Sequence, residues 1–186
     1  YVLPFITSIL AQVTFTENII STNANGAESV FAIDVDGDGD MDVLSASWAN
    51  DKVAWYENDG NQGFTEQIIS TSADAPVSVY ALDMDEDGDM DVLTASAFDD
   101  KIAWYNNDGN QTFTEQIIST NANDARSVYA VDVNGDGYMD VLSASLADDK
   151  VAWYENDGSQ VFTEHVISTN ADEAYSVYAI DVDGDG

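Results

Sequence analysis

The chain has 186 residues, and its 45% hydrophobic and 11% aromatic content predicts a folded domain rather than a disordered acidic tail. Its 36 acidic residues face four basic ones, and the formal net charge of -32 excludes nucleic acid as a partner, because phosphates require Lys and Arg. The sequence contains no run of 18 apolar residues, so it predicts no membrane-spanning helix. It also contains no cysteine, which excludes disulfides and thiolate metal sites.

The first twelve residues, YVLPFITSILAQ, are apolar and uncharged and differ from everything that follows. Two interpretations stand. The segment is either the remnant of a secretory signal peptide, with Ala11 near the cleavage point, or a degenerate outer strand. No basic region precedes the apolar run, and Ile9 is large for a cleavage site, so the sequence leaves both interpretations open.

From residue 13 to residue 186 the sequence repeats with a period of 49 residues and no insertion. Acidic loops begin at Asp34, Asp83, Asp132 and Asp181, and an AWY triplet and an FTE triplet recur in the same register. Self-similarity at a fixed period predicts a repeat architecture in which each unit is one supersecondary structure.

Each complete unit predicts four short strands in chain order. A first strand such as SVYAIDV enters the acidic loop, and a second strand, MDVLSAS, ends at a polar turn. A third strand, VAWYEN, is followed by a turn that contains glycine, and FTEQIIST is the fourth. These runs are rich in β-branched and aromatic residues and lack the 3.6-residue apolar period of a helix. The sequence therefore predicts an all-β fold of four-stranded blades like those of a β-propeller.

The complete blades are predicted at residues 28–71, 77–120 and 126–169, with partial units at 13–22 and 175–186. Three blades are fewer than the four to eight that close a propeller. Three interpretations follow. The chain is a fragment of a longer propeller, or several copies assemble end to end into rings or filaments by strand or blade complementation, or the blades form an open array with exposed edges.

The acidic loops, here called loop 1 (34–42), loop 2 (83–91), loop 3 (132–140) and the partial loop 4 (181–186), have the pattern of a metal site. Residues that offer oxygen occupy positions 1, 3, 5, 7 and 9, and position 6 is always glycine, which permits a sharp turn. Position 7 tolerates Tyr138, so we expect its backbone carbonyl to be the ligand. The predicted metal-binding residues are Asp34, Asp36, Asp38, Asp40, Asp42, Asp83, Asp85, Asp87, Asp89, Asp91, Asp132, Asn134, Asp136, Tyr138, Asp140, Asp181, Asp183 and Asp185.

Oxygen ligands with several carboxylates favour calcium, which takes six to eight oxygens in a flexible geometry. Zinc is excluded because His165 is the single histidine and there is no cysteine. We expect one Ca²⁺ in each of the three complete loops and one in the partial loop. Without metal the crowded carboxylates would push the first and second strands apart, so calcium should stabilise the fold.

The loop DVDGDGDMDVL, with VAWYENDG and FTE after it, resembles the FG-GAP/VCBS-type repeats, the calcium-loop blades of integrin-α-like β-propellers. The resemblance covers about residues 13–186. It implies a propeller, bound calcium, and an extracellular or cell-surface setting of adhesion or carbohydrate-related function, typical of secreted bacterial proteins. The literal Phe-Gly…Gly-Ala-Pro signature is absent, so the resemblance is to the broader calcium-loop class, and Asn134 and Tyr138 predict a weaker but functional third site.

No unique nucleophile and base stand apart from the repeat, so the sequence predicts no enzyme. We expect a secreted calcium-binding propeller with a structural, adhesive or self-assembly function. The alternatives are a lectin-like propeller that binds glycans, or an accessory part of a polysaccharide-active enzyme. Trp55, Trp104 and Trp153 either stack on sugars or pack between blades, and packing is favoured. Lys52 and its two equivalents are expected to pair with nearby acids.

Overall fold

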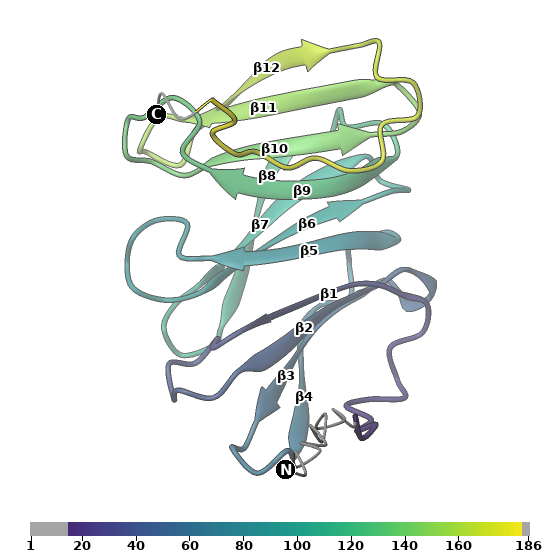
Figure 1. Ribbon diagram of the computed structural model, residues 1–186, viewed down its shortest axis with the longest axis vertical. Coiled ribbons are helices and arrows are strands. Elements are labelled where there is room, and N and C mark those ends of the chain that lie inside the picture. The colour runs from purple at the N-terminus through teal and green to yellow at the C-terminus, as the bar shows by residue number, and fades with distance from the viewer. Residues whose placement is uncertain (1–14, 184–186) are drawn as a thin grey trace, which may run out of the picture.

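The computed structural model describes residues 15–183, so the predictions for the first twelve residues and for Asp185 lie outside the described part. Within it the fold is all-β, as predicted (Figure 1). The elements are β1 (Ala27–Ile33), β2 (Asp42–Ser47), the 3-10 helix η1 (Trp48–Asn50), β3 (Lys52–Asn58), β4 (Phe64–Ser70), β5 (Pro76–Leu82), β6 (Asp91–Ser96), β7 (Lys101–Asn107), β8 (Phe113–Ser119), β9 (Ala125–Val131), β10 (Asp140–Ser145), β11 (Lys150–Asn156) and β12 (Phe162–Ser168).

The strands form three antiparallel sheets of four strands, each in sequential order, which confirms the predicted four-stranded units. We call them blade 1 (β1–β4), blade 2 (β5–β8) and blade 3 (β9–β12). The register repeats from blade to blade. Leu44 of β2 lies opposite Phe31 of β1 and Trp55 of β3, and the equivalent residues of the other blades pair in the same way.

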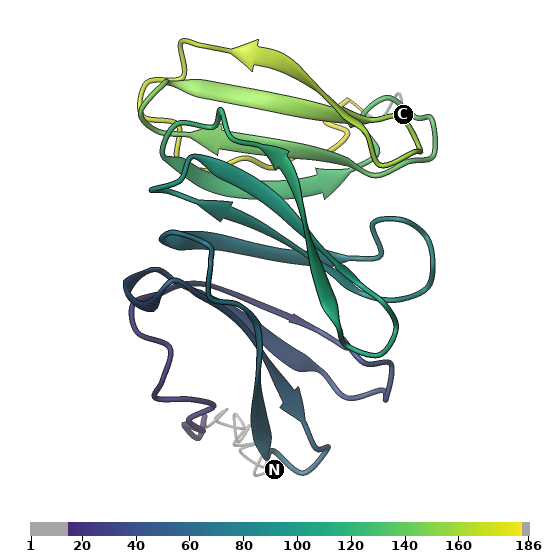
Figure 2. The same cartoon turned by 180° about the vertical axis from the view of Figure 1, so that it is seen from behind.

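The three blades stack face to face, with β1, β5 and β9 following one another along the stack (Figures 1 and 2). One apolar core fills the space between blades 1 and 2, and a second fills the space between blades 2 and 3. Trp55 and Trp104 belong to these cores and are 3% and 1% exposed, which confirms that they pack between blades. Trp153, on the outer face of blade 3, instead stacks on His165 with ring centroids 4.6 Å apart.

Polar contacts at the first strands also join successive blades. The backbone N–H of Val79 donates to the hydroxyl of Ser29, and that of Val128 donates to Ser78, at 3.2 and 3.3 Å. A line of aromatic rings crosses the same strands, with centroids 4.7 to 5.1 Å apart; its members are Phe31, Tyr80, Tyr129 and Tyr178. Because each contact recurs at the repeat period, one type of interface serves every pair of blades.

The C-terminal segment after β12 occupies the place of a fourth first strand. The N–H of Val177 donates to the hydroxyl of Ser127 at 3.3 Å, and Tyr178 packs on Tyr129, as in the other blades. Described residues 175–183 nevertheless form no regular strand, and neither do residues 15–22. A β-ladder needs a neighbouring strand, and no strand of the three described sheets pairs with either segment.

The three lysines pair with acidic side chains, as predicted. Lys101 and Lys150 are buried and pair with strand residues Glu115 and Glu164 at 2.8 and 2.9 Å, and Lys52 pairs with the equivalent Glu66. The aspartates that directly precede the lysines adopt positive φ and accept backbone N–H groups from the linker to the next blade. Lys101 and Lys150 also pair with Asp99 and Asp148 at 3.1 and 3.3 Å, which confirms the expected pairing with nearby acids. Strand pairing adds to each lysine a glutamate that is more distant in the sequence.

Candidate metal centre

Each acidic loop connects the first strand of a blade to the second through a tight turn. The position 6 glycines Gly39, Gly88 and Gly137 have φ angles of 96°, 99° and 94°, which L side chains rarely adopt. A Cβ placed on any of them would meet no atom within 4 Å. The glycine is therefore required by backbone conformation rather than by space, as the sequence predicted.

The position 1 aspartate holds the turn closed. The carboxylate oxygens of Asp34 accept the N–H groups of Gly37 and Gly39 at 2.8 and 3.0 Å. Asp83 and Asp132 accept backbone N–H groups of their own loops in the same manner. Each oxygen retains a further lone pair for a cation, because a carboxylate offers about four acceptor sites.

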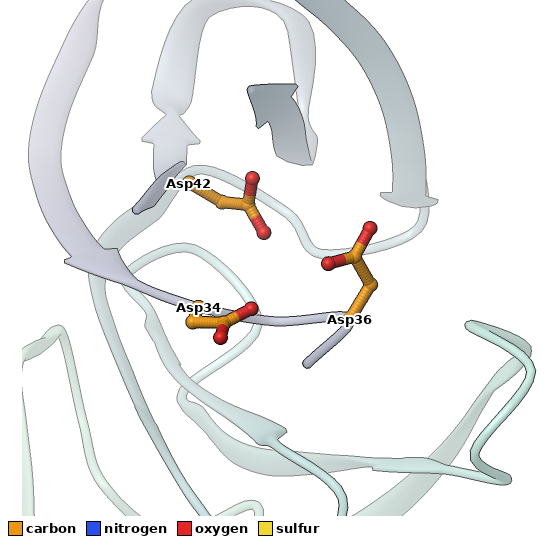
Figure 3. A group of neighbouring side chains, drawn as sticks. All are labelled: Asp34, Asp36 and Asp42. Atoms are coloured by element: carbon orange, nitrogen blue, oxygen red, sulfur yellow. The ribbon is translucent and has the colours of Figure 1, made fainter. Parts of the chain in front are cut away.

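Three carboxylates converge in loops 1 and 2. In loop 1, oxygens of Asp34, Asp36 and Asp42 lie within 4.8 Å of one another, and Figure 3 shows these three side chains around a common space. In loop 2 the group consists of Asp83, Asp85 and Asp87, so its third member comes from position 5 rather than from position 9. Within residues 15–183 no such group of three acids forms in loop 3, where Asn134 replaces the acid of position 3.

The position 9 aspartate anchors the loop to the rest of its blade. Both oxygens of Asp91 accept backbone N–H groups, from Met84 at 3.1 Å and from Asn107 at 2.8 Å. Asp42 and Asp140 make the same two bonds in their blades, and all three side chains are buried. The sequence identified this position as a ligand. Metal binding at this position stays a prediction, whereas the structure shows that the aspartate ties the loop to the end of the third strand.

The side chain of position 7 lies against the turn between the third and fourth strands. A Cβ on Gly60 would meet the carboxylate of Asp40 at 2.5 Å, and a Cβ on Gly158 would meet the ring of Tyr138 at 2.4 Å. Asp89 has the same relation to its glycine in blade 2. These side chains pack on a glycine, which agrees with the expectation that position 7 offers its backbone carbonyl and explains why tyrosine is tolerated.

The third-strand residue next to loop position 3 (residue 57, 106 or 155) differs among the blades. In blade 2 the amide of Asn106 donates to Asp85 at 2.8 Å, whereas in blade 3 the amide of Asn134 donates to Glu155 at 3.3 Å. The acid and the amide have thus exchanged places between loop and strand. Blade 1 has Asp36 and Glu57 at the two positions, and neither side chain can donate a hydrogen bond when it is ionised. Both side chains line a cavity of about 270 Å³.

Burial and mutual repulsion make several of these carboxyls easier to protonate. Burial raises the pKa of Asp91 to about 6, against the lowering effect of the N–H groups of Asn107 and Met84. Burial also raises the pKa of Asp36 and of Asp85, and neighbouring loop carboxylates add to both shifts. A bound cation would reverse these effects by favouring the ionised forms.

One atom in loop 2 indicates that the residues fit a cation. The Oδ1 oxygen of Asp85 is buried and has no hydrogen-bond partner among the described residues, while Oδ2 accepts the amides of Asn106 and Gln160. An unpartnered buried carboxylate oxygen is costly unless a cation or donor approaches it. The donor set consists of hard oxygens, which suits calcium.

Sequence reasoning missed an asparagine that completes each loop. Asn58, Asn107 and Asn156 donate their side-chain amides to the backbone carbonyls of residues 41, 90 and 139, at 3.0 to 3.2 Å. Their backbone N–H groups bind the position 9 aspartate described above. The recurrence of asparagine at the repeat period is the signal that could have revealed this function, because asparagine is unfavourable at the end of a strand.

Comparison with known protein families agrees with this geometry. The FG-GAP-like repeat matches three consecutive segments, residues 34–94, 94–143 and 132–186. The chain belongs to the FG-GAP-like repeat family. FG-GAP repeats build β-propeller-like proteins, often bind calcium and occur typically outside cells. A search of curated proteins found no match to the chain.

No helix in residues 15–183 has the length and apolar character needed to span a bilayer. This finding agrees with the sequence, in which no apolar run reaches the necessary length.

Proposed function

We propose that this FG-GAP repeat chain is a calcium-stabilised, propeller-type structural module with one Ca²⁺ in each complete loop. The observation that carries the proposal is the convergence of three carboxylates in loops 1 and 2, with an unpartnered buried oxygen on Asp85. Turns closed by the position 1 aspartates hold these oxygens in place before any ion arrives.

In this proposal the side chains of positions 1, 3 and 5 and the carbonyl of position 7 bind the ion, and position 9 both anchors the loop and contributes an oxygen. Calcium would supply charge neutralisation. Nearly half of the acidic residues lie in the four loops, and a chain of net charge -32 resists compaction unless cations offset its repulsion. The ion would thus hold the first and second strands of each blade together.

The proposed function is non-catalytic, and the proposed setting is extracellular or at a bacterial cell surface, with an adhesive or assembly function. Support for assembly comes from the exposed face of blade 1. Val30 is 69% exposed, whereas its equivalents Val79 and Val128 are each 5% exposed beneath the preceding blade. We propose that another copy of the repeat covers this face. Sedimentation of the purified chain tests it: a concentration-independent monomer would contradict self-assembly.

The glycan-binding alternative receives less support. The indoles of Trp55 and Trp104 are buried between blades, so their faces cannot stack on a sugar, and Trp153 is stacked on His165. A glycan array remains the direct test of this alternative.

The calcium proposal is tested by titration calorimetry on metal-stripped protein. We expect calcium to bind at about three sites and magnesium to bind far more weakly, because magnesium prefers fewer protein ligands and more water. The matched control carries D38A, D87A and D136A, which removes one carboxylate from each complete loop at an exposed position. Equal calcium binding by this control and by the native chain would contradict the proposal.

A further inference from the structure

The turns between the third and fourth strands contain a strained residue that recurs in every blade. Gln62, Gln111 and Gln160 adopt φ angles of 69°, 57° and 61°, in the left-handed region that glycine occupies without penalty. Glycine or asparagine would be easier to accommodate there. A long side chain retained three times in an unfavourable backbone conformation indicates that its amide has a use.

The contact made by Gln160 shows what that use is. Its amide Nε2 donates to Oδ2 of Asp85 at 3.1 Å, and the two residues are 75 positions apart. Gln160 belongs to blade 3, whereas Asp85 occupies position 3 of loop 2 in blade 2. The same Oδ2 accepts Asn106 of its own blade at 2.8 Å, which leaves Oδ1 of Asp85 buried and unpartnered.

The equivalent residue of blade 2 faces loop 1. Gln111 lines the cavity of about 270 Å³ whose wall includes Asp36, the position 3 residue of loop 1. At the blade 2–3 junction, Gln160 and Asp85 line a cavity of about 80 Å³. In both junctions the glutamine of one blade therefore lies beside the loop of the blade before it. Gln62 belongs to blade 1, and among residues 15–183 no acidic loop lies before that blade, so no loop of the described blades faces Gln62.

We propose that Gln160, and by the same register Gln111, is a positioning residue that orients the position 3 carboxylate of the preceding blade for calcium. This inference rests on the proposed calcium function. Donation to Oδ2 turns Oδ1 toward the ion space, as second-shell hydrogen bonds commonly orient metal ligands. The sites of loops 1 and 2 are then each built from two blades, and metal binding at either loop stabilises the packing of the next blade.

The test measures calcium affinity at loop 2 in a parent version of this chain that carries D36A and D136A. The first change removes a member of the converging group of loop 1, and the second removes a carboxylate of loop 3, so loop 2 keeps its own group of three acids. Q160G should weaken calcium binding about tenfold, in the range found for second-shell metal partners. Q160N keeps a side chain that tolerates positive φ but shortens the amide, so the same weakening is expected without a folding defect. Q62G is the matched control and should leave the affinity unchanged.

A second readout separates positioning from turn geometry. Glycine relieves strain, so a turn residue with no other function would be stabilised by the change. We expect Q62G to raise the metal-free melting temperature and Q160G to reduce the rise that calcium produces. Native calcium affinity in both Q160G and Q160N would overturn the inference while leaving the calcium proposal intact. No calcium binding by the parent, together with none by the native chain, would overturn both.

Discussion

Loops 2 and 3 share one backbone frame but differ in the charge that they offer a cation. In both, an aspartate at position 1 closes the turn, and a buried aspartate at position 9 binds two backbone N–H groups. Loop 2 adds an acid at position 3 and an amide on the neighbouring strand, whereas loop 3 has the reverse arrangement, Asn134 beside Glu155. Three acids converge in loop 2, and no such group forms in loop 3 within residues 15–183.

The difference shows that the residues of an acidic loop have two separate functions: some form the backbone turn, and others would attract a cation. The frame depends on positions 1, 6 and 9 and on the strand asparagine, and it forms wherever these are present. Metal affinity depends in addition on how many carboxylates face the ion, because calcium sites are tuned by ligand charge. Loop 3 therefore has the same shape as loop 2 with a weaker expected attraction for calcium.

The largest expected effect concerns the frame that the two loops share. D91A and D140A should each lower the free energy of unfolding by about 2–5 kcal/mol in the presence of a chelator, because each leaves two buried N–H groups without an acceptor. Urea denaturation measures the loss. D87A is the control at an exposed position in the same loop and should cost much less without metal, because the one N–H group that it leaves without an acceptor, that of Asp89, can bind water. If D91A unfolds with the same free energy as the native chain, position 9 is not an anchor.

The next effect concerns charge. N134D should raise calcium affinity at loop 3 about tenfold, or about 1.4 kcal/mol, by restoring the acid of position 3. D85N should produce a loss of similar size at loop 2. Titration calorimetry on variants that retain a single intact loop measures both. Equal affinities for loops 2 and 3 in the native chain would show that this exchange is neutral.

The pH dependence should reverse with calcium. Burial raises the pKa of Asp91 from 3.8 to about 6, so the folded state holds this proton more tightly than the unfolded state. Its contribution to stability is complete below pH 3.8 and is lost as the pH rises through about 6. In chelator the melting temperature should therefore fall as the pH rises from 3.8 to about 6. With calcium the stabilisation should instead grow over this range, because the metal needs ionised ligands. A metal-free melting temperature that rises with pH would contradict this account.

The smallest effect is expected at position 7. Y138D makes loop 3 resemble loop 2 at this position, yet calcium affinity should change by less than about twofold, because the backbone carbonyl is the expected ligand. Calorimetry on the same single-loop background measures it. A gain as large as that of N134D would show that the side chain at position 7 binds the ion.

Much of the fold could be predicted because the repeat supplies its own comparison. Alignment of the repeat sequences with one another reveals four strands at a fixed spacing, a glycine at position 6 and a variable position 7. The glycine requirement is local, since a positive φ restricts a single residue, so Gly88 could be interpreted correctly from the sequence alone.

The contacts that sequence reasoning missed are those made through space. Asp91 serves as an anchor because strand β7 brings Asn107 beneath it, and Lys101 pairs with Glu115 because β8 lies alongside β7. Gln160 reaches Asp85 from the next blade, a relation that depends on how two sheets stack. Such contacts follow from register and packing, which the 49-residue period implies but does not specify.

The most direct test of the account is differential scanning calorimetry of the native chain with saturating calcium and with a chelator. Binding at 100 times the dissociation constant stabilises a site by about 2.7 kcal/mol, which for a chain of this size corresponds to a rise of at least about 5 °C. We predict that calcium raises the melting temperature by this amount or more. An identical melting temperature in calcium and in chelator would contradict the claim that these loops hold calcium.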